Sequence, residues 1–338
     1  MPKTNLLRLH ANGSLDTGFE AGVIDGSVAS ILPLSNGKIF IGGGFKKVHG
    51  VARPGIALIN TNGTLDTSFV PNLGSFFGAS VQAIAVQPVD GKILIAGGAS
   101  RFNPVPTVTT SPVLRLETNG TLDGSFTPLQ FGISQQYALD MVLQADGKIV
   151  ISGTFDSVGG APHLGIACLN ANGTLNANWP GAGVNALNSA YRNVSAMIAQ
   201  PDGKILIGGR FEQYNGTGRV GIARLNADGN LDSGFTSPAT STFQVNTMAL
   251  QSNGKIIAGG VFSLGTTGYS IIRLNGGTAQ PTITFALQAG SLLHFDVPAG
   301  FKLQHTAMPP TGWQDVLGNP PFDLPIVEPR DFFRLISL

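Results

Sequence analysis

A chain of 338 residues with a net charge of +1 and only 12% charged residues is a poor partner for nucleic acid or an anionic membrane. Its 46 glycines argue against a helical fold, and a single cysteine excludes both a disulfide framework and a thiolate metal cluster. No apolar stretch reaches the length of a membrane helix, and the first residues lack the apolar core of a signal peptide.

In chain order, the first element to recur is an Asx-Gly-Lys turn followed by an aliphatic run and small glycines. The glycines of its five copies are residues 37, 91, 147, 203 and 254, so the spacing is 51 to 56 residues. A period of this size is typical of repeat architectures. A two-residue turn needs positive φ, which glycine adopts easily, so each copy predicts a hairpin of two strands.

The fourth repeat shows the complete predicted unit. Strand A covers residues 194–199, strand B 204–209, strand C 221–226 and strand D 231–235, with Asp-Gly turns between A and B and between C and D. Four antiparallel strands per repeat are typical of a β-propeller blade. We therefore predict an all-β fold, a β-propeller of four-stranded antiparallel blades.

The ends of the repeat array suggest how the ring closes. Strands A and B occur five times and strand C six times, whereas strand D is missing after Leu274 and has a spare copy at residues 15–19. We predict that this N-terminal strand completes the last blade and removes an exposed edge. Five blades are favoured. Six are the alternative, if tail strands near 282–287 and 292–297 join the N-terminal C and D strands.

The repeated phrases, Leu-Asn-x-Asn/Asp-Gly-x-Leu-Asp-x-x-Phe and Gln-x-Asp-Gly-Lys-Ile-x-Ile-x-Gly, resemble the delta-sixty repeat family of bacterial β-propellers over roughly residues 6–275. The resemblance implies a propeller on an exported or surface protein and no single activity. Low charge and abundant Asn, Thr, Ser and Gly also resemble secreted bacterial proteins. We expect an extracellular or cell-surface location in a bacterium.

The tail departs from the repeat. Segments 301–304, 312–316 and 331–335 resemble a small β-module that ends many exported bacterial proteins. The predicted domains are therefore a propeller over residues 1–278 and a small β-rich module over residues 279–338.

The connections between strands differ in how much they vary. The A–B and C–D turns are nearly identical in every repeat, whereas the B–C and D–A connections differ, and loops commonly carry function. Aromatics beside amides and charges suit a glycan or another small ligand, or a protein partner. The alternative is that the aromatics fill gaps between blades. The predicted ligand-binding residues are Phe131, Trp179, Tyr191, Arg192, Arg210 and Tyr214.

One position of strand A is exceptional. Ser30, Ala83, Ala196 and Thr247 are uncharged where the third repeat has Asp140. A carboxylate in the channel needs a partner, water or a cation. With Gln82, Asn246 and Asp25 it could form an axial site for Ca²⁺. The alternative is that Asp140 points between blades.

These observations lead to two main hypotheses. The first is a non-enzymatic propeller that binds a ligand or partner through its variable connections. The second is a calcium-dependent lactone or ester hydrolase, in which His49 or His163 acts as general base. A glycosidase with carboxylates from Asp25, Asp156 and Glu212 ranks lower, because these acids come from different blades. The sequence predicts no nucleic-acid partner and leaves enzyme activity and oligomeric state undecided.

Overall fold

The computed structural model describes residues 5–73, 80–98, 111–132, 137–186, 192–236, 243–264 and 267–274, and six strands of the tail between residues 284 and 337. Strands, turns and connecting segments account for these residues, and no helix occurs among them. The chain divides into two compact units, Met1–Leu250 with Ile257–Arg273 and Gln251–Ile256 with Leu274–Leu338. The predicted boundary at residue 278 stays a prediction.

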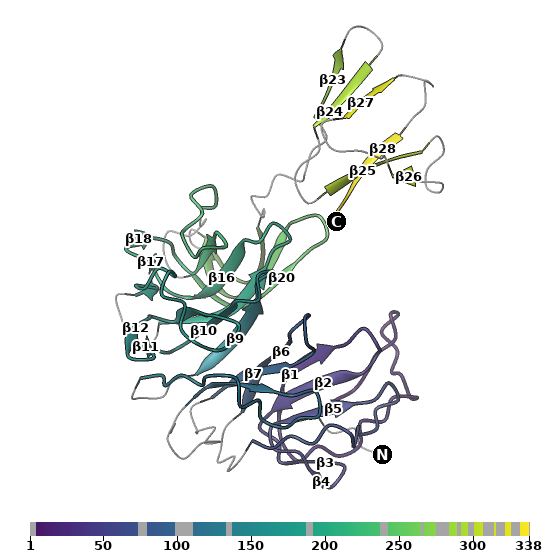
Figure 1. Cartoon of the computed structure of the whole chain (residues 1–338), viewed down its shortest axis with the longest axis vertical. Coiled ribbons are helices and arrows are strands. Elements are labelled where there is room, and N and C mark those ends of the chain that lie inside the picture. The colour runs from purple at the N-terminus through teal and green to yellow at the C-terminus, as the bar shows by residue number, and fades with distance from the viewer. Residues whose placement is uncertain are drawn as a thin grey trace. The chain divides into compact units, whose positions relative to one another are not determined.

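Five antiparallel sheets of three strands follow one another along the first unit, one for each repeat (Figure 1). Strand B of the predicted repeat is the central strand of each sheet. It pairs with strand A on one edge and with strand C on the other. The sheets are β1(Val28–Pro33)–β2(Ile39–Gly43)–β5(Ile56–Ile59), β6(Val81–Val86)–β7(Ile93–Gly97)–β8(Val113–Leu116), β9(Ala138–Leu143)–β10(Ile149–Gly153)–β13(Ile166–Leu169), β15(Asn193–Ala199)–β16(Ile205–Arg210)–β19(Ile222–Leu225) and β20(Phe243–Leu250)–β21(Ile256–Leu264)–β22(Thr267–Leu274).

Strand D is shorter than predicted. In the fourth repeat it pairs with strand C only through the isolated bridge between Leu225 and Leu231. The next residue, Asp232, then turns the chain, because its carboxylate accepts the Gly234 N–H and its carbonyl accepts the Phe235 N–H. Equivalent bridges end the C–D turns at Leu15, Leu65, Leu122 and Leu175.

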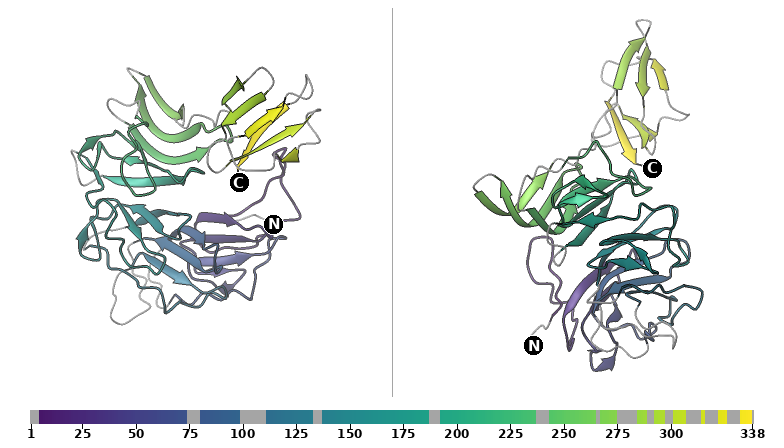
Figure 2. Two further views of the ribbon diagram at one scale, coloured as in Figure 1. Left: turned by 45° about the horizontal axis from the view of Figure 1, so that its top comes forward. Right: turned by 90° about the vertical axis from the view of Figure 1, so that its left-hand side faces the viewer.

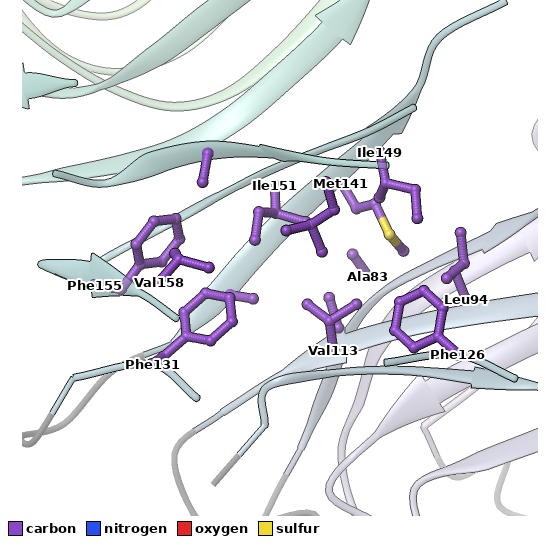
Figure 3. Packing of buried hydrophobic residues seen from close by; sticks show 14 residues of the cluster. Ala83, Leu94, Val113, Phe126, Phe131, Met141, Ile149, Ile151, Phe155 and Val158 are labelled. Atoms are coloured by element: carbon purple, nitrogen blue, oxygen red, sulfur yellow. The ribbon is translucent and has the colours of Figure 1, made fainter. Parts of the chain in front are cut away.

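The core lies between successive sheets. Strand C shows the rule: its first and third residues pack against the next repeat, and its second and fourth against the preceding one. Ile56 and Leu58 of β5 share a cluster with Leu114 and Leu116 of β8. Figure 3 shows the cluster between the second and third repeats, in which Val113 of β8 packs with Ile151 of β10 and with Phe126 and Phe131. Each sheet therefore has two different apolar faces.

The two ends of the array expose opposite faces of strand C. All four residues of the strand are buried in the first four sheets. In the N-terminal copy, residues 6–9, Leu6 is buried whereas Leu7 and Leu9 are 54% and 53% exposed. In β22 the pattern reverses, since Ile271 is 70% exposed and Ile272 is buried. The number of blades and the closure of the ring stay predictions.

The tail unit contains two further antiparallel sheets, also drawn in the two views of Figure 2. The strands predicted near 282–297 are β23(Thr284–Gln288) and β24(Leu292–Asp296), which pair with each other, and β24 also pairs with β27(Phe322–Pro325). The second sheet has the order β26(Gln314–Asp315)–β25(Phe301–Thr306)–β28(Phe332–Ser337). The tail is therefore β-rich, as the sequence predicts.

Candidate functional site

We call the side of the repeats that carries the A–B and C–D turns the turn side. A cluster of charges recurs there. In the fourth repeat, Asp232 Oδ2 accepts hydrogen bonds from Arg224 Nε at 2.6 Å and from Lys204 Nζ at 2.9 Å. Arg224 is 2% exposed, and its guanidinium carbon lies 5.1 Å from the centre of the Phe235 ring. We call this arrangement the clasp. It joins strands B, C and D of one repeat through a single carboxylate.

The clasp also links neighbouring repeats. In the second repeat Asp123 accepts from Arg115 at 2.6 Å and from Lys92 at 3.0 Å. The same arginine donates through Nη1 to the Ala171 carbonyl, 2.5 Å away in the C–D turn of the next repeat. The N-terminal Arg8 makes the corresponding bond to Thr61 at 2.7 Å. The arginine of the clasp therefore connects adjacent repeats.

Hydrogen bonding keeps the clasp carboxylates ionised. Burial raises the pKa of Asp232, but bonds from Lys204, the Gly234 N–H and Arg224 outweigh burial and hold the pKa at about 2. In the first repeat, bonds from Lys38 and Ser68 likewise lower the pKa of Asp66 to about 2. Asp232 and Asp66 are therefore ionised at neutral pH and bonded within the scaffold.

The third repeat lacks the clasp. Cys168 and Asn176 stand where the fourth repeat has arginine and aspartate, and Asn176 Nδ2 lies 3.7 Å from Cys168 Sγ. Lys148 pairs instead with Asp146, in its own turn. Burial raises the pKa of the Cys168 thiol to about 11, so it stays protonated. A packing role for this cysteine agrees with its complete burial.

The other side of the repeats, which we call the loop side, carries the B–C and D–A connections. We expected the B–C connections to differ, but in three repeats they form the same hairpin. The hairpins are β3(Lys47–Val48)–β4(Val51–Ala52), β11(Ser157–Val158)–β12(Ala161–Pro162) and β17(Gln213–Tyr214)–β18(Thr217–Gly218), and they appear at the periphery of the array in Figure 1. The variation therefore lies in side chains, on one shared backbone.

A segment of the preceding D–A connection crosses each hairpin. Ile24 bridges to Val48 and Phe131 to Val158. In the fourth repeat the crossing is a short strand, β14(Val184–Asn185), which pairs with β17. Backbone hydrogen bonds thus join the described D–A segments to the three hairpins.

The structure corrects the predicted ligand-binding aromatics. Trp179 is 3% exposed, and its ring lies so close to Gly229 that a Cβ there would be 2.6 Å from ring atoms. Tyr214 is fully buried, and its hydroxyl donates to the Gly229 carbonyl at 2.5 Å. Phe131 is buried edge-on against Phe155, with ring centres 5.0 Å apart. These rings fill the wedges between repeats, which was the alternative interpretation.

The predicted arginines have different surroundings. Arg192 pairs with Asp156 of the third repeat, yet only 9% of its side chain is exposed and burial lowers its pKa. Arg210, at the end of β16, is exposed, and its backbone N–H donates to Asn193 Oδ1 at 3.0 Å. Tyr191 lies outside the described residues.

The residues predicted to hold a metal are not brought together. Asp140 follows a β-bulge in β9, and its carboxylate accepts the N–H groups of Met141 at 2.7 Å and of Met197, in the next repeat, at 2.6 Å. It therefore points between repeats. Burial raises its pKa to about 6 in spite of the two amide bonds. Asp25 accepts instead the N–H groups of Lys46 and Lys47.

The remaining predicted ligands add little to this site. Gln82 occupies the bulge of β6, and Asn246 Oδ1 accepts a bond from the Gln244 side chain at 2.9 Å. Among the described residues no three His, Cys, Asp or Glu side chains are grouped as a metal site. The axial Ca²⁺ site therefore stays a prediction from sequence.

The two histidines proposed as general bases belong to hairpins of different repeats. His49 occupies a hairpin turn with φ of 53°, and its Nε2 contacts the Ala21 carbonyl. His163 is 4% exposed, burial lowers its pKa, and its Nδ1 has no partner among the residues that the structure describes. The hydrolase hypothesis stays a prediction from sequence.

The family comparison decides the architecture. The model of a β-propeller family described as a domain of unknown function (DUF5122) matches residues 2–19, 34–69, 90–126, 144–178, 200–235 and 251–276, more than half of the chain. The chain belongs to this family. The all-β propeller prediction is thereby confirmed, whereas the delta-sixty name and the blade count are not tested. The first DUF5122 match, residues 2–19, covers only strands C and D of a repeat. The last match, residues 251–276, ends just after strand C of the fifth sheet, β22.

Solved structures of propeller type are similar to this chain at low identity. A Bacteroides caccae protein of unknown function is 13% identical over 78% of this chain and 81% of its own, with a TM-score of 0.44. A protein of unknown function from Dyadobacter fermentans is 13% identical over 81% of this chain and 92% of its own, with a TM-score of 0.43. PorZ, a surface component of the Porphyromonas gingivalis type-IX secretion system, is 14% identical over 96% of this chain and 43% of its own, with a TM-score of 0.47. Comparison with curated proteins gave no match. No helix among the described residues is long and apolar enough to cross a membrane.

Proposed function

We propose that this DUF5122 propeller is a non-catalytic binding module of an exported or surface protein, and that its loop side takes the ligand or partner. One observation carries the proposal. Three hairpins of the loop side share one backbone but display different side chains, whereas the turn side repeats the same ion pairs. Recognition needs a constant frame with variable groups on it, and the loop side has both.

Charge indicates the kind of ligand. On the turn side, acids and bases neutralise one another within the clasps. On the loop side the described cations outnumber the acids: Lys46, Lys47, Arg53, Arg192, Arg210 and Arg219 stand against Glu20, Asp25, Asp156 and Glu212. A surface with excess positive charge attracts anionic partners and speeds their encounter. We therefore favour an anionic glycan or an acidic protein surface over a neutral ligand.

The test is a screen of the full chain against glycan and peptide arrays at low and at physiological salt. We expect binding to acidic probes that weakens with salt, and a loss of affinity in Arg210→Ala. Lys148→Ala, an exposed cation of the turn side, is the matched control and should bind normally. The proposal fails if the arrays show no ligand, or if both variants weaken binding equally.

A further inference from the structure

Equivalent hairpins allow residues to be compared at the same place in three repeats. Just outside each hairpin, one backbone hydrogen bond closes its base: Arg53 N–H to Lys46 O at 2.8 Å, His163 N–H to Asp156 O at 3.0 Å, and Arg219 N–H to Glu212 O at 2.7 Å. Residues paired in this way have their side chains on the same face of the ladder, about 5 Å apart at Cβ. The two members of each pair are therefore neighbours.

The first repeat differs from the others in the charges of this pair. In the fourth repeat Glu212 stands opposite Arg219, and in the third Asp156 stands opposite the buried His163. In the first repeat the acid is replaced by Lys46, so two like charges are opposed. Lys47, the next residue, lies opposite Ala52 and adds a third positive charge to the hairpin. Like charges directly opposite each other are destabilising unless something compensates them.

The nearest acid compensates only in part. Asp25 Oδ1 accepts the backbone N–H groups of Lys46 and Lys47, at 2.7 and 2.8 Å. These bonds hold the pKa of Asp25 below its ordinary value, so it stays ionised. One carboxylate, tied to the backbone, thus faces three cations. Both lysines are exposed and extend to solvent.

The buried member of the group has one donor without an acceptor. Arg53 is 4% exposed, and its Nη1 donates to the Ala52 carbonyl at 2.8 Å. Its Nε, also buried, has no acceptor among the described residues, as is also the case for Nε of Arg219 in the fourth repeat. A buried donor without an acceptor is unfavourable. A missing acceptor and excess positive charge at one hairpin both call for an anion.

We propose that Lys46, Lys47 and Arg53 form a binding site for a phosphate or sulfate group, free or as an ester on a larger molecule. This inference rests on the proposed function and names its ligand class. A planar carboxylate is fully matched by one guanidinium fork, whereas a tetrahedral oxyanion has oxygens left for two ammonium groups. The exposed lysines capture the anion, and Arg53 supplies the donor that lacks an acceptor.

The experiment is calorimetric titration of the full chain at low ionic strength with inorganic phosphate, inorganic sulfate, a sugar phosphate and a sulfated oligosaccharide. The inorganic arms test the free anion and the other two its esters. We expect binding that weakens with added chloride. Lys46→Glu restores the pairing of the fourth repeat, so it should weaken binding more than about tenfold and raise the melting temperature without ligand.

The fourth repeat supplies the reciprocal variant. Glu212→Lys reproduces the charges of the first repeat, so it should add a second site for the same anions. Unchanged affinity in Lys46→Glu, or no binding in any arm, would overturn the inference. If the arrays identify a ligand that Lys46→Glu leaves unaffected, this site is refuted while the proposed function stands. If sulfate binds but the arrays show nothing, the site stands and the proposed function fails.

Discussion

The two sides of the repeats use charge in opposite ways. On the turn side, each clasp aspartate binds a lysine and, in two complete copies, a buried arginine, and the third repeat loses base and acid together. On the loop side one hairpin backbone recurs three times with charged residues that differ between repeats. Repetition of residues therefore marks the scaffold, and repetition of backbone with changing residues marks the surface that we propose for recognition.

The largest expected effect on stability comes from removing a ring between repeats. It tests whether Trp179 is part of the core or of the proposed recognition surface. Trp179→Ala removes a buried ring that packs on Gly229, so we expect a loss of about 3–5 kcal/mol in the free energy of unfolding. Urea denaturation measures it. A variant that binds ligand poorly but unfolds like the parent would return Trp179 to the recognition surface.

Breaking a clasp should come next. Asp232→Ala leaves Arg224 buried without its carboxylate, and such uncompensated charges cost about 3 kcal/mol. The stabilisation by ionised Asp232 should be present above pH 3.8 and be lost as the pH falls toward 2, since its pKa is lowered to about 2. Denaturation curves between pH 2 and 7 check both points. Asp146→Ala, in the exposed pair of the third repeat, is the control and should change stability by less than about 0.5 kcal/mol.

The acid between the third and fourth repeats should act in the opposite sense. The pKa of Asp140 is raised to about 6, so the folded state holds its proton more tightly than the unfolded chain does. Its contribution to stability is complete below pH 3.8 and is lost as the pH rises through 6, by at most about 3 kcal/mol. We expect Asp140→Asn to remove this slope from the stability profile. A profile that keeps the slope in the variant would assign it to another group.

The smallest expected effect comes from rebuilding the missing clasp. Cys168→Arg alone buries a cation without a partner and should destabilise the third repeat. Adding Asn176→Asp supplies the carboxylate, so the two changes should couple favourably by about 1–3 kcal/mol in a double-mutant cycle. Additive effects would show that the clasp needs more than its two charged residues.

The sequence predicted the scaffold well because its signals are local. Asx-Gly turns, aliphatic strands and the 51 to 56 residue period all depend on residues close together in the chain. The clasp was missed although a partial signal existed: the arginine of strand C and the aspartate of strand D are both replaced in the third repeat, by Cys168 and Asn176, whereas the first repeat keeps the aspartate without the arginine. A pairwise comparison of the repeats would have found it.

The candidate site was harder to predict because side-chain direction decides it. A tryptophan after strand D has the same appearance in sequence whether it fills a wedge or faces solvent. Asp140 was expected in the channel, but the bulge in β9 turns it toward the Met197 amide. The like charges of Lys46 and Arg53 became visible only when the hairpin paired residues seven positions apart.

The alternation along strand C has a consequence for how such a chain can change in length. Each repeat presents one kind of face forward and a complementary kind backward, and the two ends of the array keep one of each. Duplicating or deleting a whole period at the genetic level would join a forward face to a backward face as before. Growth by units of one period therefore places a forward face against a backward face at each new junction, which suits lengthening and shortening by recombination.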